Sequence, residues 1–242
     1  MPDILWFKGL TPAEEKANTL TDKTGNGHDA TLSGAASFFN FATRGKVLLF
    51  PVSTSGYALV AGGFTLNITQ GLTVGVWLWR QDNAPAMILD RDSSFRLWFP
   101  DSSGKITFTA LIGGQWLVIE SETAIPTQQW IFIEVSFGPI VTNLYVHGSI
   151  KGVGYPSGAF NDTPNPIWIG RSSSGSHQFA GYIGEVLIKD AFVDLAEHRL
   201  DLKRWLKREQ ASVVELLELH APGETLRFCS RPTPITLTVY DV

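Results

Sequence analysis

The side chains that could carry out catalysis in this sequence are isolated from one another. Glycoside hydrolysis needs two carboxyl groups on one surface, yet Glu134 and Glu185 each lack a second acid two or four residues away. Ser174 lies in a Ser-Gly-Ser segment, and no Gly-x-Ser-x-Gly turn that exposes a nucleophilic serine precedes a helix. The five histidines have no His-Glu-x-x-His spacing, which leaves a zinc site without support. We therefore expect a protein that is not an enzyme and has no resident cofactor, with calcium as the open exception.

Ligand binding by aromatic rings and planar polar side chains is the alternative to catalysis. Candidate rings are Trp98, Trp116, Tyr145 and Trp168. Residues 171–178 form a polar, glycine-containing loop between two strand-like segments, and loops of this kind often carry recognition residues. The predicted ligand-binding residues are therefore Trp98, Trp116, Arg171, His177 and Gln178. The competing interpretation is that these rings are packing anchors of a hydrophobic core.

The composition describes one well-packed globular domain. The chain has 242 residues, 44% hydrophobic and 17% charged, and this length is sufficient to bury one large core. The single cysteine, Cys229, excludes an intramolecular disulfide and a cysteine metal cluster. The net charge of −4 provides no general attraction to nucleic acid or to an anionic membrane, so neither is expected as a partner.

No apolar run approaches the roughly 20 residues that a membrane-spanning helix needs. The first residues, Met1–Lys8, contain neither a basic segment nor a long apolar stretch, and so do not resemble a secretory signal. Synthesis in the cytoplasm is the expectation.

Short β-branched and aromatic runs alternate with turn residues from the start of the chain to about Asp190, which predicts an all-β antiparallel sandwich. In Leu72–Arg80 both faces are apolar, as in a central strand that is covered on both sides. In Trp130–Phe137 one face is apolar and the other becomes polar, which predicts a wetter side. The clearest predicted strands are 47–52, 72–80, 86–90, 95–99, 105–111, 116–120, 130–137, 143–147, 166–170 and 182–189.

The pattern changes near Ala191. Apolar residues from Asp194 to Leu219 recur in steps of three, four and seven, which predicts an amphipathic helix, or two consecutive helices that divide near Ser212. Acidic residues interleave with its basic run, which favours a solvated helix face over nucleic-acid binding. The expected organisation is a sandwich over 1–190, a helical segment over 191–221 and a β tail over 222–242.

Five segments, taken in order, carry a resemblance to a known family. Residues 20–32 read Leu-Thr-Asp-Lys-Thr-Gly-Asn-Gly-His-Asp-Ala-Thr-Leu, and residues 47–50 read Val-Leu-Leu-Phe. Residues 72–78 contain Thr-x-x-x-Trp, 143–148 contain Leu-Tyr-Val-x-Gly, and 167–186 contain Ile-Gly followed by Phe-x-Gly-x-Ile-x-Glu-Val. This series resembles laminin-G-like domains of the concanavalin A-like lectin/glucanase superfamily. Residues 197–207 resemble the helix of stand-alone bacterial and phage members.

The resemblance implies a jelly-roll sandwich and raises two site hypotheses. Glycosidases of the superfamily carry Glu-x-Asp-x-x-Glu on one strand, and this motif is absent here. Relatives often hold calcium through Asp or Asn side chains, so Asp22, Asn26 and Asp29 are candidate calcium ligands. The alternative is that these three side chains cap a turn around Gly25 and Gly27.

Three functions stay open at this point. The leading hypothesis is a non-enzymatic structural module of a larger assembly, displayed on the surface of a phage virion as a decoration, fibre or tail-associated protein. Its partners would be other structural proteins of the assembly or copies of itself. The second hypothesis is a carbohydrate-binding adhesion module that recognises cell-surface glycan, with or without calcium. The third is a glycan hydrolase or lyase with an atypical site.

Overall fold

The computed structural model describes residues 3–8, 10–41, 45–52, 55–68 and 71–193, together with the backbone of residues 225–228 and 235–238. The chain divides into two compact units, Met1–Ala196 and Glu197–Val242, which we describe separately.

The first unit is built almost entirely of strands. Its one described helix is α1, Pro12–Ala17. The strands are β1 Asp3–Phe7, β2 Thr19–Leu20, β3 Ala30–Gly34, β4 Ser37–Phe41, β5 Gly45–Phe50, β6 Gly56–Val60, β7 Leu72–Arg80, β8 Ala86–Arg91, β9 Phe95–Phe99, β10 Thr107–Ile112, β11 Gln115–Glu120, β12 Trp130–Phe137, β13 Thr142–Val146, β14 Ser149–Gly154, β15 Ile167–Ile169 and β16 Gly181–Lys189.

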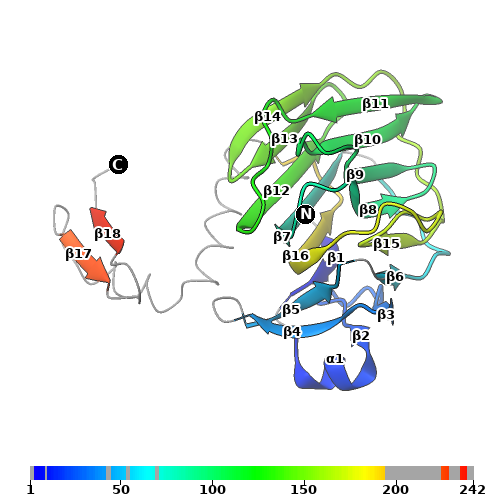
Figure 1. Ribbon diagram of the computed structural model, residues 1–242. Coiled ribbons are helices and arrows are strands. Elements are labelled where there is room, and N and C mark those ends of the chain that lie inside the picture. Colours follow the sequence, from blue (N-terminus) through cyan, green and yellow to red (C-terminus); the bar gives the residue numbers. More distant parts are fainter. Residues whose placement is uncertain are drawn as a thin grey trace. The chain divides into compact units, whose positions relative to one another are not determined.

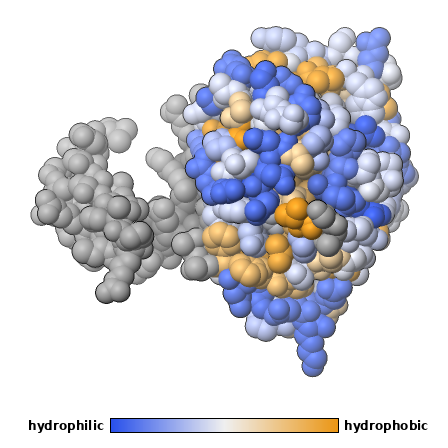
Figure 2. Space-filling model, in the orientation of Figure 1, coloured by the Kyte–Doolittle hydropathy of each residue, from blue (hydrophilic) through white to orange (hydrophobic). Residues whose placement is uncertain are grey.

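These strands form two antiparallel sheets, which confirms the predicted all-β sandwich (Figure 1). Sheet A runs in the order β14-β13-β12-β7-β16-β5-β4, with β1 also paired to β16. Sheet B runs in the order β11-β10-β9-β8-β15-β6-β3-β2. Alternate residues of most strands enter one core, such as Val74, Val76 and Leu78 from sheet A and Phe95 and Leu97 from sheet B. The face in view in Figure 2 is largely polar, with small apolar areas between the polar side chains.

Two expectations about sheet A have different outcomes. Strand β7 lies between β12 and β16 and is buried along nearly its whole length, as its apolar faces predicted. The expected wetter side of β12 is wrong, because Glu134 is 1% exposed and Ser136 is completely buried. The ring of Phe132 on this face packs against Trp77 of β7, with ring centroids 5.3 Å apart. A polar residue type therefore did not indicate exposure in this strand.

Helix α1 was not predicted, and its short sequence begins with a capping box. Thr11 is the N-cap, and its side chain accepts a hydrogen bond from the Glu14 backbone N–H, while the Glu14 carboxylate accepts from the Thr11 backbone N–H. The carboxylate of Glu14 also accepts from the Thr21 backbone N–H and from the Lys23 ammonium, at 2.9 and 2.8 Å. Glu14 therefore ties the helix to the turn that leads into β3.

The described part of the second unit is one antiparallel pair of strands. Strand β17, Thr225–Phe228, pairs with β18, Ile235–Thr238, in the register that opposes Thr225 to Thr238. Both strands fall within the predicted C-terminal β tail. The helix predicted over 194–219 lies outside the described residues. Over the described ranges, no helix has the length and apolar character needed to cross a membrane.

Candidate functional site

The outer face of sheet B gathers the residues that the sequence selected for ligand binding. Phe95, Leu97 and Phe99 of β9 point into the core, so Trp98 between them points to the outer face. Ile167 and Ile169 place Trp168 of β15 on the same face, by the same alternation. Strand β15 then leads into the loop of residues 171–178, which supplies Arg171, His177 and Gln178.

Arg171 lies against two aromatic rings of this face. The central carbon of its guanidinium is 3.8 Å from the ring centroid of Tyr57 and 4.6 Å from that of Trp168. The two rings are themselves 5.1 Å apart and tilted by 46°. Because an arginine held on ring faces loses little further side-chain freedom on binding, its guanidinium is prepared to bond to a ligand.

His177 connects the loop to Trp98. The two rings meet edge to face, with centroids 5.4 Å apart. The backbone carbonyl of His177 accepts a hydrogen bond from the Met87 N–H at 2.8 Å, and Met87 is the cross-strand partner of Trp98. His177 adopts a positive φ of 52°, a conformation that non-glycine residues rarely adopt. The loop end is therefore fixed on the sheet at the position of Trp98.

The buried carboxylate of Asp90, in β8, connects loop 171–178 to the sheet. Its carboxylate is fully buried; one oxygen accepts from the Arg96 Nε at 3.0 Å and the other from the Ser173 backbone N–H at 2.7 Å. Within the loop, the hydroxyl groups of Ser172, Ser174 and Ser176 lie within 3.0 Å of one another. The three serine hydroxyls of the loop are thus fixed relative to one another by hydrogen bonds.

Trp116 lies at the edge of the same sheet, on strand β11. Its side chain is 43% exposed, and the guanidinium of Arg96 lies 5.2 Å from its ring centroid. Arg96 therefore bridges from Asp90 to Trp116. Trp116 is close to the site but is separated from Trp98 by strand β10. Of the other candidate rings, Tyr145 belongs to sheet A and is 1% exposed, so it lies outside this site.

Three polar atoms of the selected residues have no hydrogen-bond partner among the described residues. They are the Trp98 Nε1, the Arg171 Nε and the Gln178 Oε1, each buried from solvent. Gln178 does donate through its Nε2 to the Gly175 carbonyl, at 2.8 Å, which orients the amide. An unpaired buried polar atom is unfavourable by about 1–3 kcal/mol, so these three atoms are a local cost to the fold.

The three candidate calcium ligands lie together in the turn before β3, at a distance from the loop in sequence and in a different part of the sheet. Asp22 accepts hydrogen bonds from the backbone N–H groups of Trp6, Thr24 and His28 and from the Thr24 hydroxyl. Asp29 accepts from the Asp22 N–H, and the Asn26 amide donates to the carbonyls of Asp3 and Ile4. These bonds describe a turn, and the calcium interpretation stays a prediction.

The isolated acids of the sequence lie on sheet A, on either side of β7. Glu134 is opposite Gly75 and Glu185 is opposite Trp77, and the Glu185 carboxylate accepts a hydrogen bond from the Trp6 indole. Across the described ranges, no group of three or more histidine, cysteine or acidic side chains is placed to hold a metal ion.

The sequence analysis missed Tyr57 and Arg96, and it considered Asp90 only as an alternative calcium candidate beside Asp92. Arg96 and Trp98 are two residues apart on one strand, so period-two alternation would have placed the arginine beside the selected ring. Tyr57 lies in β6, a strand that the sequence analysis did not single out. No local signal joins Asp90 to Ser173, because their contact spans 83 residues of sequence.

Comparison with known proteins identifies this architecture. A family model described as the concanavalin A-like lectin/glucanases superfamily matches residues 52–196, more than half of the chain. No curated protein matches the sequence.

Several solved structures share the fold at low sequence identity. The binding domain of Paraclostridial Mosquitocidal Protein 1 is 11% identical, with a TM-score of 0.68, and the match covers 84% of this chain and 52% of that one. The binding domain of botulinum neurotoxin DC in complex with SialylT is 13% identical, with a TM-score of 0.64 and coverage of 84% and 51%. The binding domain of botulinum neurotoxin serotype D is 14% identical, with a TM-score of 0.64 and coverage of 86% and 53%. This chain thus spans about half the length of these structures, and the likeness is one of fold.

Proposed function

Because the chain belongs to the concanavalin A-like lectin/glucanase superfamily, we propose that it is a non-enzymatic carbohydrate-binding module whose site is the outer face of sheet B with loop 171–178. The observation that carries the proposal is the guanidinium of Arg171, held on the rings of Tyr57 and Trp168. Beside it lie the hydroxyls of Ser172, Ser174 and Ser176. A sugar offers both the apolar ring face and the hydroxyls that such a site binds.

Acidic glycans are the first ligands to test. A guanidinium bonds a carboxylate with two parallel N–H donors, and this geometry favours arginine over lysine. One of the structures of similar fold is in complex with SialylT. Another is that of botulinum neurotoxin type C, whose cell entry is described as dependent upon interaction with two ganglioside molecules. We propose sialylated glycans as the ligand class of this site.

Binding to a glycan array, in calcium and in EDTA, tests the proposal. Arg171→Ala is expected to weaken binding at least tenfold, which corresponds to about 1.4 kcal/mol, because it removes the charged donor and uncovers the two rings. Lys151→Ala is the matched control, because it removes one positive charge from β14 of sheet A. Both proteins should melt within a few degrees of the parent. A silent array, or equal binding by both variants, would reject this site.

Comparing array binding in calcium with binding in EDTA distinguishes calcium-assisted from calcium-independent glycan recognition. Loss of binding in EDTA that Asp22→Asn reproduces would support calcium-assisted recognition, whereas unchanged binding in EDTA would support a site made by the protein alone.

We also propose, as a second function, a structural role in a larger assembly, because apolar side chains are exposed along the two edge strands β11 and β14. Val118 of β11 is 60% exposed, and Ile150 and Val153 of β14 are 44% and 46% exposed. Edge strands present unpaired backbone groups to a neighbouring chain. In its finer form, the assembly is a phage virion on which a stand-alone member of the family serves as decoration, fibre or tail-associated protein.

Substitution of the exposed edge tests the structural role. The double variant Val118→Lys and Ile150→Lys is expected to prevent self-association, or incorporation into purified particles, by placing charges at the edge. Val52→Lys is the control, since Val52 is 50% exposed after β5, away from these strands. Sedimentation velocity gives the oligomeric state. An unchanged state for the double variant, or equal loss in both proteins, contradicts an edge interface.

A further inference from the structure

The outer face of sheet B carries a second pair of an arginine and an aromatic ring, away from Arg171. The guanidinium of Arg96, on β9, lies 5.2 Å from the ring centroid of Trp116, on β11. Both side chains reach solvent, since Arg96 is 33% exposed and Trp116 is 43% exposed. The indole therefore has apolar surface open to a ligand outside its contact with Arg96.

Two polar side chains stand beside this ring. The Nε of Arg96 donates to Asp90 at 3.0 Å, and its Nη2 lies 3.4 Å from the carboxylate of Asp92, which is 50% exposed. Among the described residues, no acceptor bonds to the Nη1 of Arg96. Because two carboxylates balance the charge of Arg96, this end of the face suits a neutral group that both donates and accepts hydrogen bonds, such as a sugar hydroxyl.

Arg171 differs from Arg96 in its charge balance. Its guanidinium lies on the rings of Tyr57 and Trp168, and no carboxylate of the described residues forms an ion pair with it. The Arg171 end of the face therefore suits an acidic group, and the Trp116 end suits a neutral one.

The carboxylate of Asp90 connects the two ends. One of its oxygens accepts from Arg96 and the other from the backbone N–H of Ser173, so loop 171–178 and Arg96 meet on a single carboxyl group. The strand register also places Asp90 directly between Arg96 of β9 and Trp168 of β15. The two ends thus belong to one continuous surface.

The length of this surface follows from the strand order. Trp116 and Trp168 lie on β11 and β15, which are separated by β10, β9 and β8 (Figure 1). Four intervals of about 4.8 Å between neighbouring strands give a span of about 19 Å. A single sugar residue is too short to contact both ends.

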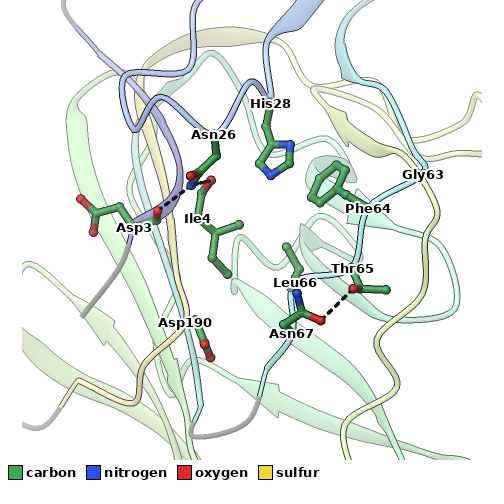
Figure 3. Close-up of a pocket in the computed structure, with 10 residues that line it drawn as sticks. All are labelled: Asp3, Ile4, Asn26, His28, Gly63, Phe64, Thr65, Leu66, Asn67 and Asp190. Carbon is green, nitrogen blue, oxygen red and sulfur yellow. Dashed lines mark hydrogen bonds between the residues drawn. The ribbon is translucent and has the colours of Figure 1, made fainter.

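Figure 3 shows an open pocket of about 610 Å³ that is not part of this surface. It is lined by residues of β1, the turn before β3, the loop after β6 and the end of β16, including Asp3, Phe64 and Asp190. The ring of Phe64 stacks on His28, with centroids 3.9 Å apart, and Arg91 lies against the same ring. Phe64 consequently exposes a smaller fraction of its surface than Trp116 does, which favours the sheet B face for a sugar ring.

We infer that the sheet B face is one extended site for a linear acidic oligosaccharide. The acidic sugar lies at Arg171, and neutral sugars extend across β8 and β9 to Trp116. There a sugar ring packs on the indole, and its hydroxyls bond to Arg96 and Asp92. The inference rests on the proposed function and adds to it the length of the ligand and the direction in which it lies.

Affinities of the full chain for a short and a long glycan test the inference. The short glycan is 3′-sialyllactose, and the long one carries the same terminal sialic acid on two linked N-acetyllactosamine units. Isothermal titration calorimetry should give at least fivefold tighter binding of the long glycan, which corresponds to about 1 kcal/mol, because it alone extends toward Trp116.

Variants of Trp116 locate the neutral end. Trp116→Ala is expected to remove the advantage of the long glycan and to leave the affinity for 3′-sialyllactose unchanged, whereas Trp116→Tyr should keep the advantage because it keeps an aromatic ring. Ile140→Ala is the matched control, since Ile140 is 78% exposed in the turn between β12 and β13 of sheet A. Arg96 stays in place in these variants, because its removal would leave the buried Asp90 without its charged partner.

The possible outcomes separate this inference from the proposed function. Equal affinity of the parent for the two glycans, with binding lost in Arg171→Ala, would overturn the extended site and leave the proposed function intact. Weaker binding of 3′-sialyllactose by Trp116→Ala, or loss of the long-glycan advantage in Ile140→Ala, would also overturn it. A parent that binds neither glycan would reject the proposed function and this inference with it.

Discussion

Gly181→Ala is expected to destabilise the sandwich by at least about 3 kcal/mol, within the range of severe backbone substitutions. Gly181 begins β16 with a φ of 141°, and a Cβ at this position would lie 2.1 Å from the Trp79 carbonyl oxygen and 3.0 Å from the Arg80 Cα. Both neighbours are backbone atoms of β7, and Gly181 is directly opposite Arg80 in the ladder. The clash can be relieved only by separating two central strands, so no side-chain movement avoids it.

Thermal unfolding and urea titration check this result. At about 2–4 °C per kcal/mol for a domain of this size, the melting temperature should fall by roughly 10 °C, or the variant should fail to fold. Gly175→Ala is the matched control, because Gly175 has a φ of 85° and no atom within 4 Å of the added Cβ. It should lose only the 1–2 kcal/mol of the left-handed conformation. If the two variants were equally stable, the close packing of β16 on β7 would not explain why position 181 requires glycine.

The stability of the fold is expected to decrease as the pH falls from about 4.5 to about 2, in part through Glu14. Burial raises the pKa of this carboxyl, but hydrogen bonds from Lys23, Thr11 and Thr21 outweigh it and lower the pKa from 4.5 to about 2. Because the pKa is lower in the folded state, the charged form stabilises the fold above pH 4.5, and this contribution is lost as the pH falls through the folded pKa. A pKa lowered by this much corresponds to a contribution of about 3 kcal/mol to the free energy of unfolding above pH 4.5.

Unfolding free energies of the parent and of Glu14→Gln between pH 7 and pH 2 measure this contribution. The difference between the two proteins should be largest near neutral pH and should shrink below pH 4.5. Glu15→Gln is the control on the same helix, since Glu15 is 49% exposed and pairs with Lys46. Solvent-exposed ion pairs contribute little to the free energy of unfolding, so Glu15→Gln should change stability little at any pH. A constant difference between parent and Glu14→Gln across the pH range would contradict the assignment.

Sequence alternation was a good guide wherever a strand has one face in the core. Leu72–Arg80, Phe95–Phe99 and Trp130–Phe137 were predicted with the bounds that the structure has. Alternation failed for β12, where Glu134 and Ser136 are buried, because the pattern reports residue polarity and not what packs on the outer face of a sheet. It also gave no sign of helix α1, whose six residues are too short for helical periodicity.

The candidate site was only partly accessible from the sequence. Residue types selected Trp98, Arg171, His177 and Gln178, which share the outer face of sheet B and its adjoining loop. The contacts that hold Arg171 and its loop on the sheet come from Tyr57 and Asp90, which are 114 and 81 residues from Arg171 in the chain. Strand order, which depends on the pairing of β15 with both β6 and β8, brings them together.

The spacing of apolar residues and glycines by itself determined that this protein is an antiparallel sandwich, because strand faces and tight turns are local properties of the chain. Only the tertiary structure decided which side chains meet on the sheet B face, and that Asp22, Asn26 and Asp29 bond to a turn. It alone placed Asp3, Phe64 and Asp190 around one pocket. Such contacts depend on strand order and cross-strand register, and neither is encoded in the local spacing of residues.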